Sequence, residues 1–190
     1  MTKQPRNAAT GLVILATMFT LCRSAEAADG SPTLAATGPS LSRVRSRNAA
    51  IVRVIRDATE RSVTFRELVR TIDASDGIVY VEPGRCERRV PACLVAVMAS
   101  GPNRLLHIKV DPAKEDSDLM GSIGHELRHA LEVLSERWVT DNASMYLFFD
   151  RIGRQRGDSQ SPTFETPAAV EAGEAVRAEV RKAKRTAQEP

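Results

Sequence analysis

The sequence predicts an α+β fold, in which about five helices pack with a small antiparallel sheet of three strands. Two observations predict this class. Apolar residues recur at helical spacing in two segments, 41–72 and 118–184, which is typical of amphipathic helices. Between these segments, three short runs rich in β-branched residues are separated by Pro and Gly, which is typical of strands.

The first 27 residues are expected to be an export signal. Lys3 and Arg6 precede an apolar run that extends to about Cys22, and Ala25-Glu26-Ala27 forms an A-x-A cleavage site. The run is shorter than the roughly 20 apolar residues that a membrane span requires, so no stable membrane insertion is expected after cleavage. Residues 28–40 are small and contain Pro and Gly, and are expected to form a flexible lead-in. The domain that follows is therefore expected in a periplasm or outside the cell.

Removal of this signal would leave 163 of the 190 residues, which suffices for one domain with a core. The domain is placed at 41–185, with a disordered tail at 186–190. The formal charge would fall from +3 to about +1, and basic residues alternate with acids along the predicted helices. Aromatic residues make up 4% of the chain. This composition predicts a solvated surface and no nucleic-acid partner.

Two helices are expected at the start of the domain. The segment from Leu41 to about Arg61 places apolar residues at helical spacing, with arginines between them. Thr64-Phe65-Arg66-Glu67 has the pattern of a capping box, so a second helix is expected to begin there.

The three predicted strands are 77–84 (GIVYVEPG), 92–101 (ACLVAVMASG) and 104–111 (RLLHIKVD). The loop between the first two contains Cys86 and Cys93. Because the export signal implies an oxidising compartment, these two cysteines are expected to form a disulfide.

Three further helices complete the predicted fold. Asp116 and Ser117 are suited to cap a helix from about Asp118 to Glu136. A second helix is expected over 142–152, followed by a polar loop. In the third, Thr166 stands at the N-cap and Pro167 at the first helical position, so a closing helix is expected to run to about Lys184.

Two of the three histidines lie on the helix predicted at 118–136. On a helical wheel of about 100° per residue, His125, His129, Glu132 and Glu136 fall on one stripe, and most apolar residues gather on the other side. Residues four apart on a helix lie one above the other, so two imidazoles at this spacing are able to share one metal ion. Glu126 lies about 100° around the helix, where it would reach a water on that ion as a general base.

His125-Glu126-Leu127-Arg128-His129 matches HExxH, and on this motif the chain resembles the zincin superfamily of metallopeptidases. The charged Arg128 departs from the usual pattern of two uncharged residues before the second histidine. The resemblance implies a zincin-like core, Zn²⁺ held by His125 and His129, and hydrolysis of a peptide or protein substrate with Glu126 as the base. It also implies that an edge strand before the motif helix holds the substrate, a place that RLLHIKV would occupy.

The third ligand decides the subclass. Glu132 and Ser135 stand where the metzincin branch needs Gly and His, which leaves a gluzincin-like arrangement with a carboxylate ligand. Glu165 is preferred because it directly precedes a helix able to dock beside the motif helix. Glu132 lies about 10 Å along the helix from His125 and is better placed to hydrogen-bond a ligand histidine. Asp141 and Asp150 stay open as alternatives.

Two questions stay open on the sequence. Tyr146, Arg151 and His107 are each candidates to stabilise the oxyanion of a peptidase reaction. The alternative to a peptidase is a non-catalytic envelope protein, in which a zincin-like scaffold acts by contacting another protein.

Overall fold

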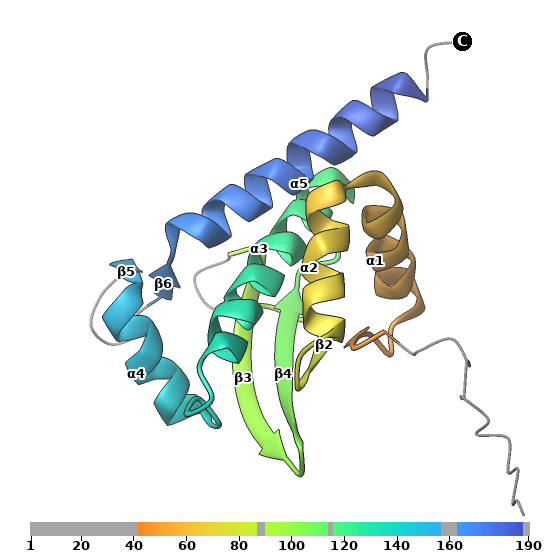
Figure 1. Ribbon diagram of the computed structural model, residues 1–190. Helices are drawn as coiled ribbons and strands as arrows, with labels where there is room; N and C mark the ends of the chain where they lie inside the picture. Colours follow the sequence, from red (N-terminus) through yellow and green to blue (C-terminus); the bar gives the residue numbers. More distant parts are fainter. Residues whose placement is uncertain (1–41, 87–89, 114–115, 157–162, 188–190) are drawn as a thin grey trace, which may run out of the picture. The chain divides into compact units, whose positions relative to one another are not determined.

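The computed structural model describes residues 42–86, 90–113, 116–156 and 163–187. The predicted export signal, the whole of the predicted lead-in and the end of the predicted tail lie outside the described residues. The described part has an α+β architecture with five helices, a four-stranded mixed sheet and a separate two-stranded sheet (Figure 1). The predicted class is confirmed, whereas the prediction of three antiparallel strands was wrong in detail.

The main sheet contains β1 (Val44–Arg45), β2 (Gly77–Pro83), β3 (Ala92–Ser100) and β4 (Asn103–Val110). Their order is β1-β2-β4-β3. β4 pairs in parallel with β2 and antiparallel with β3. The strand RLLHIKV is therefore internal, and the edge strand that precedes the motif helix is β3.

The lengths of the connections between strands explain why the sheet is mixed rather than antiparallel throughout. β3 and β4 are joined by a tight turn in which Gly101 has a φ of 57°, a conformation that favours glycine, so they form a hairpin. The connection from β2 to β3 is longer, and β4 inserts between these two strands. The predicted disulfide between Cys86 and Cys93 is confirmed, and it links the segment after β2 to β3 across the end of β4. Lys109 of β4 is the pairing partner of Cys93, and its carbonyl contacts the Cys86 sulfur.

The first two helices are α1 (Ala49–Arg61) and α2 (Val63–Asp73). The predicted helix began too early, because Val44 and Arg45 form β1 and Asn48 caps α1 by accepting from the backbone amides of residues 50 and 51. Ser62, rather than Thr64, caps α2 by accepting from the amide of Phe65.

The motif helix is α3 (Asp116–Ser135), and it is buried on nearly every side. It contacts the main sheet, α1 and α2, while α5 (Pro167–Thr186) packs along it (Figure 1). Close approach of α3 and α5 depends on glycine: a Cβ on Gly121 would lie 2.9 Å from the Gly173 carbonyl, and one on Gly173 would lie 3.0 Å from the His125 Cβ. The helix that carries both histidines is thus held rigidly between sheet and α5.

The segment between α3 and α5 contains α4 (Asn142–Ile152), β5 (Arg154–Arg156) and β6 (Thr163–Glu165). The prediction of an irregular polar loop was wrong at its two ends, because β5 and β6 form an antiparallel pair in which Arg154 lies opposite Glu165. β6 leads directly into α5, whose N-cap is Thr166 as predicted.

The main core lies between the sheet and the helices. Its fully buried side chains come from α2, from the strands β2 and β4, and from α3. They include Phe65, Ile72, Val79, Leu106, Ile108, Ile123 and Leu127. Within the described residues, no helix combines the length and the apolar character needed to cross a membrane.

Candidate metal centre

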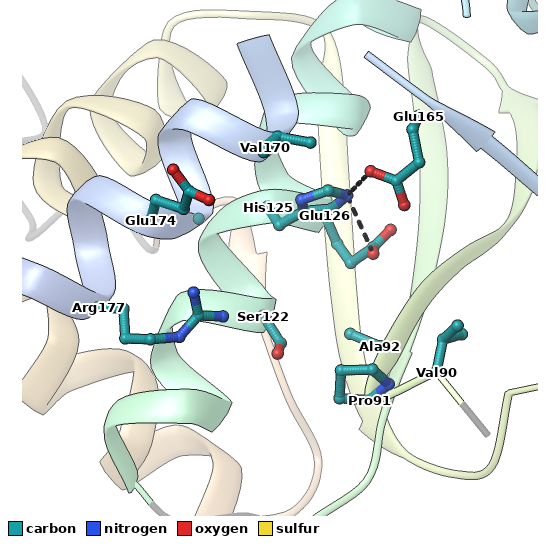
Figure 2. Close-up of a pocket in the computed structure, with 11 residues that line it drawn as sticks. Val90, Pro91, Ala92, Ser122, His125, Glu126, Glu165, Val170, Glu174 and Arg177 are labelled. Carbon is teal, nitrogen blue, oxygen red and sulfur yellow. Dashed lines mark ion pairs between the residues drawn. The ribbon is translucent and has the colours of Figure 1, made fainter. Parts of the chain in front are cut away.

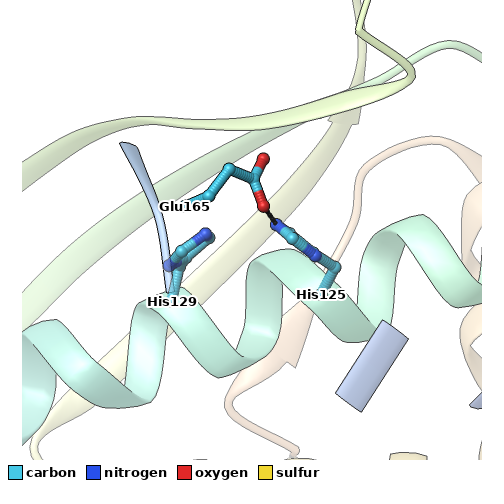
Figure 3. A group of neighbouring side chains, drawn as sticks. All are labelled: His125, His129 and Glu165. Atoms are coloured by element: carbon cyan, nitrogen blue, oxygen red, sulfur yellow. Dashed lines mark ion pairs between the residues drawn. The ribbon is translucent and has the colours of Figure 1, made fainter. Parts of the chain in front are cut away.

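The structure brings His125, His129 and Glu165 together at the junction of α3, β6 and α5. Each offers one ligand atom, and the three atoms lie within 4.8 Å of one another, with both imidazoles directed toward the carboxylate (Figure 3). The histidines come from consecutive turns of one helix, and Glu165 is the last residue of β6. The group has the donors and the convergence required to hold a metal ion.

The spacing of the group fits a small divalent ion. A tetrahedral site with bonds of about 2.1 Å places its ligand atoms about 3.4 Å apart. His125 Nε2 lies 3.4 Å from Glu165 Oε2, and the other separations are no larger than 4.8 Å. Small rotations of the side chains would therefore complete the coordination without moving α3.

A chain of hydrogen bonds orients His129. Its Nδ1 lies 2.9 Å from Glu132 Oε2, and the Thr166 hydroxyl donates to Glu132 Oε1 over 2.7 Å. Donation from Nδ1 leaves the lone pair of Nε2 for a metal. Because Thr166 directly follows Glu165 and caps α5, the same chain also anchors the segment that carries the carboxylate of the group.

Within these hydrogen bonds, His129 and Glu132 each stabilise the charged form of the other. Burial alone would lower the pKa of His129, but the hydrogen bond with Glu132 and the nearby negative charges hold it above its ordinary value. Burial would likewise raise the pKa of Glu132, but the hydrogen bonds from His129 and Thr166 hold it below its ordinary value. Glu132 is thus a stable carboxylate whose role is to support His129.

Glu132→Gln is expected to lower zinc affinity by about 10- to 100-fold, the usual cost of losing a carboxylate partner of a ligand histidine. Competition with a chromogenic zinc chelator measures this change. Glu136→Gln, one turn further along the chain and bonded to Trp138, is the matched control and is expected to leave the affinity unchanged. Equal affinities in the two variants would show that the Glu132–His129 bond does not matter for metal binding.

His125 is held in its neutral form. Burial, and then the neighbouring His129, lower its pKa to about 4. A neutral imidazole is the form that binds metal, so His125 is ready to act as a ligand at neutral pH.

Glu126 is buried beside the group and is bonded to the sheet. Its Oε2 accepts from the Leu94 amide of β3 over 2.7 Å, and its Oε1 lies 4.0 Å from His125 Nε2. Burial is the main reason that its pKa is raised to about 7, against an ordinary value of 4.5. Oε2 of Glu126 is thus fixed by Leu94, while Oε1 faces the metal group formed by His125, His129 and Glu165. The carboxyl group of Glu126 exchanges a proton near neutral pH.

This raised pKa predicts a pH dependence of stability. A carboxyl group with a higher pKa in the folded state stabilises the fold most below pH 4.5, and this contribution is lost as the pH rises through 7. Metal-free wild type is therefore expected to lose up to about 3 kcal/mol relative to metal-free Glu126→Gln between these limits. Urea unfolding of both proteins in chelator at pH 4.5 and 8 measures the difference. A constant difference would show that Glu126 titrates normally.

A cavity of about 240 Å³ opens beside the group (Figure 2). His125, Glu126 and Glu165 line it on one side. The rest of the lining comes from the start of β3 and the two residues before it, from α3 and from α5: Val90, Pro91, Ala92, Ser122, Val170, Gly173, Glu174 and Arg177.

The chain matches no protein-family model, and neither curated proteins nor solved structures yield a match. The function is therefore inferred from the site itself.

The other candidate ligands lie elsewhere. Asp141 is the N-cap of α4, where its side chain accepts from Ser144, and Asp150 is exposed on the same helix. Arg128, the departure from the usual motif, lines a different cavity with Thr64 and other residues of α2 and α5. Its Nε also lies 3.8 Å from Glu132 Oε1, so the charge of Arg128 faces the carboxylate that bonds His129.

None of the three candidate oxyanion stabilisers lines the cavity of about 240 Å³. His107 stacks on Tyr80, with its ring on the opposite face of β4 from the buried Leu106 and Ile108. Tyr146 packs edge-on against Phe164, and Arg151 is exposed near the end of α4.

Sequence reasoning missed three contributors to the site. The Leu94 amide carries no side-chain signal at all. Ser122 and Arg177 line the cavity from helices whose local sequences read as ordinary amphipathic surface. Thr166 was predicted as a helix cap, but nothing in the sequence indicated its bond to Glu132.

Proposed function

We propose that this protein is an exported zinc-dependent metallopeptidase with a small gluzincin-like core. The observation that carries the proposal is the convergence of His125, His129 and Glu165 beside the buried carboxylate of Glu126. Two imidazoles and one carboxylate on rigid elements, with a cavity alongside, are the requirements of a hydrolytic metal site that keeps a position open for substrate.

Zinc is the metal that suits these donors best. Imidazole is a good ligand for zinc, whereas calcium and magnesium prefer sites made of oxygen atoms. When bound, zinc supplies Lewis acidity, which lowers the pKa of a water molecule and polarises a peptide carbonyl.

Glu126 would accept the proton of that water at Oε1, the oxygen that faces His125, and later return it to the leaving amine. Its pKa of about 7 suits both transfers, because neither form of the carboxyl group is strongly disfavoured at neutral pH. The Leu94 amide holds the other oxygen and fixes the orientation of the base.

The strand order supports a position for the proposed substrate. β3 is the edge strand, but its Val97 amide donates to Asn142 and its Ala99 amide to the Thr140 carbonyl. These two hydrogen bonds occupy the amides in the half of the β3 edge that lies near α4. The Leu94 amide is also occupied, because it donates to Glu126. A peptide would therefore lie beside the start of β3 at Ala92, which lines the cavity, without taking up the Leu94 amide.

Metal analysis and a degradation assay test the proposal. Purified full-length chain is expected to hold about one zinc per molecule and to cleave a broad peptide library. A chelator is expected to remove the activity, and added zinc to restore it. A chain that holds no zinc would overturn the proposal.

The bond between Glu126 and Leu94 favours a second candidate, because it ties β3 to α3 as a purely structural contact would. In that case the protein is a non-catalytic envelope protein that acts by contacting another protein. Zinc binding without cleavage of any member of the library would favour this second candidate.

A further inference from the structure

We propose that Arg177 forms a subsite for a carboxylate group of the peptide substrate, either its C-terminus or an acidic side chain. This inference rests on the proposed peptidase function and names the substrate class of the same site.

Arg177 lies on α5 and lines the cavity together with His125 and Glu126. Its side chain extends from α5 toward Ser122 of α3, and it lies on the other side of His125 from Glu165 (Figure 2). About one third of the side chain is exposed, at 32%. Its Nε and Cβ lie over Gly121, where the absence of a side chain provides the space for the stem.

Asp118 positions the guanidinium and leaves most of its donors for a ligand. The ion pair joins Arg177 Nε to Asp118 Oδ1 over 3.2 Å. An arginine carries two further amino groups beyond Nε, and Figure 2 shows this end of the side chain directed between α5 and Ser122. Asp118 also pairs with Arg181 over 2.9 Å, so its charge is divided between two arginines.

Three acids also line the cavity, and two of them have partners away from Arg177. Glu126 accepts from Leu94, Glu165 faces His125, and Glu174 is exposed on α5. Arg177 is the cation of the lining, and guanidinium stays charged at any pH of interest. It is therefore the group in this wall that would attract an anion.

A carboxylate is the anion that fits both the fork of arginine and the proposed reaction. Guanidinium binds carboxylates through paired, charge-assisted hydrogen bonds, which discriminate strongly against a neutral amide. The buried Ser122 hydroxyl lines the same wall and offers a further donor. A peptide whose backbone lies near β3 would place such a group beyond the metal, on the side opposite Glu165.

Binding to the zinc-loaded full chain, with Glu126→Gln to keep peptides intact, tests the inference by calorimetry. The probes are acetylated tetra-alanine with a free C-terminus, the same peptide amidated, and amidated peptides with Asp or Asn at the third position. We expect at least one of the carboxylate peptides to bind about 10- to 100-fold more tightly than its neutral counterpart. The first pair reports on the C-terminus and the second on an acidic side chain.

Arg177→Gln is expected to abolish this preference. Arg181→Ala is the matched control, because Arg181 pairs with the same Asp118 but does not line the cavity, and it is expected to retain the preference. Equal binding of charged and neutral peptides would overturn the inference. So would a preference that survives in Arg177→Gln, since the carboxylate would then be bound by zinc alone. Failure of the peptidase proposal would instead appear as wild-type chain without zinc-dependent cleavage, whatever the peptide preference.

Discussion

Glu126→Gln is expected to lower peptide hydrolysis by about 10²- to 10⁴-fold while zinc stays bound. Loss of a positioned general base typically costs 10²- to 10⁴-fold, and the amide of Gln has no site for the transferred proton. The amide oxygen is still able to accept from Leu94, so the contact between α3 and β3 is retained. Turnover of a library-derived peptide, together with zinc content, measures both effects.

Glu136→Gln, directly after the end of α3, is the control for this experiment and is expected to keep full activity. A Glu126→Gln protein that binds zinc and still hydrolyses peptides would show that another group takes the proton. In that case the Leu94 bond would be the main role of Glu126.

Glu165→Ala is expected to lower zinc affinity by more than about a hundredfold. Residues that only hydrogen-bond to a metal ligand contribute 10- to 100-fold to metal affinity. Glu165 would itself be a ligand, with a donor atom only 3.4 Å from that of His125, so its loss is expected to cost more. Chelator competition on the purified variant measures the affinity. Thermal unfolding with and without added zinc gives a second reading, because a tightly bound ion stabilises only the folded chain.

Asp150→Ala is the matched control, since this acid is exposed on α4 and does not belong to the metal group. Unchanged zinc affinity in Glu165→Ala would exclude Glu165 as a ligand. The third donor would then have to come from another carboxylate beside the histidines, Glu126 or Glu132.

Helices were the most predictable part of the fold, because their apolar periodicity and capping residues are local signals. The N-cap of α5 at Thr166 and the extent of α4 followed directly from the sequence. Strand order was not predictable, since pairing depends on contacts between distant segments. Nothing in the run from Ala92 to Ser100 indicates that it pairs only with β4, or that β2 runs parallel to β4.

The metal group was predictable for a similar reason. His125 and His129 lie on consecutive turns of one helix, so their spacing alone brings them together, and Glu165 was found through its position before a docking helix. The surroundings of the group were not predictable. The wheel placed both histidines on a polar face, whereas α5 covers that face and His129 is buried.

The covalent link between Cys86 and Cys93 has a practical consequence for studies of this protein. It closes the segment that contains Val90, Pro91 and Ala92, which line the cavity together with His125 and Glu126. Chain produced in a reducing cytoplasm would keep every metal donor yet lose the restraint on this wall. Recombinant material should therefore be made by secretion or oxidative refolding, so that assays of the proposed metal and peptide binding are carried out with this wall restrained.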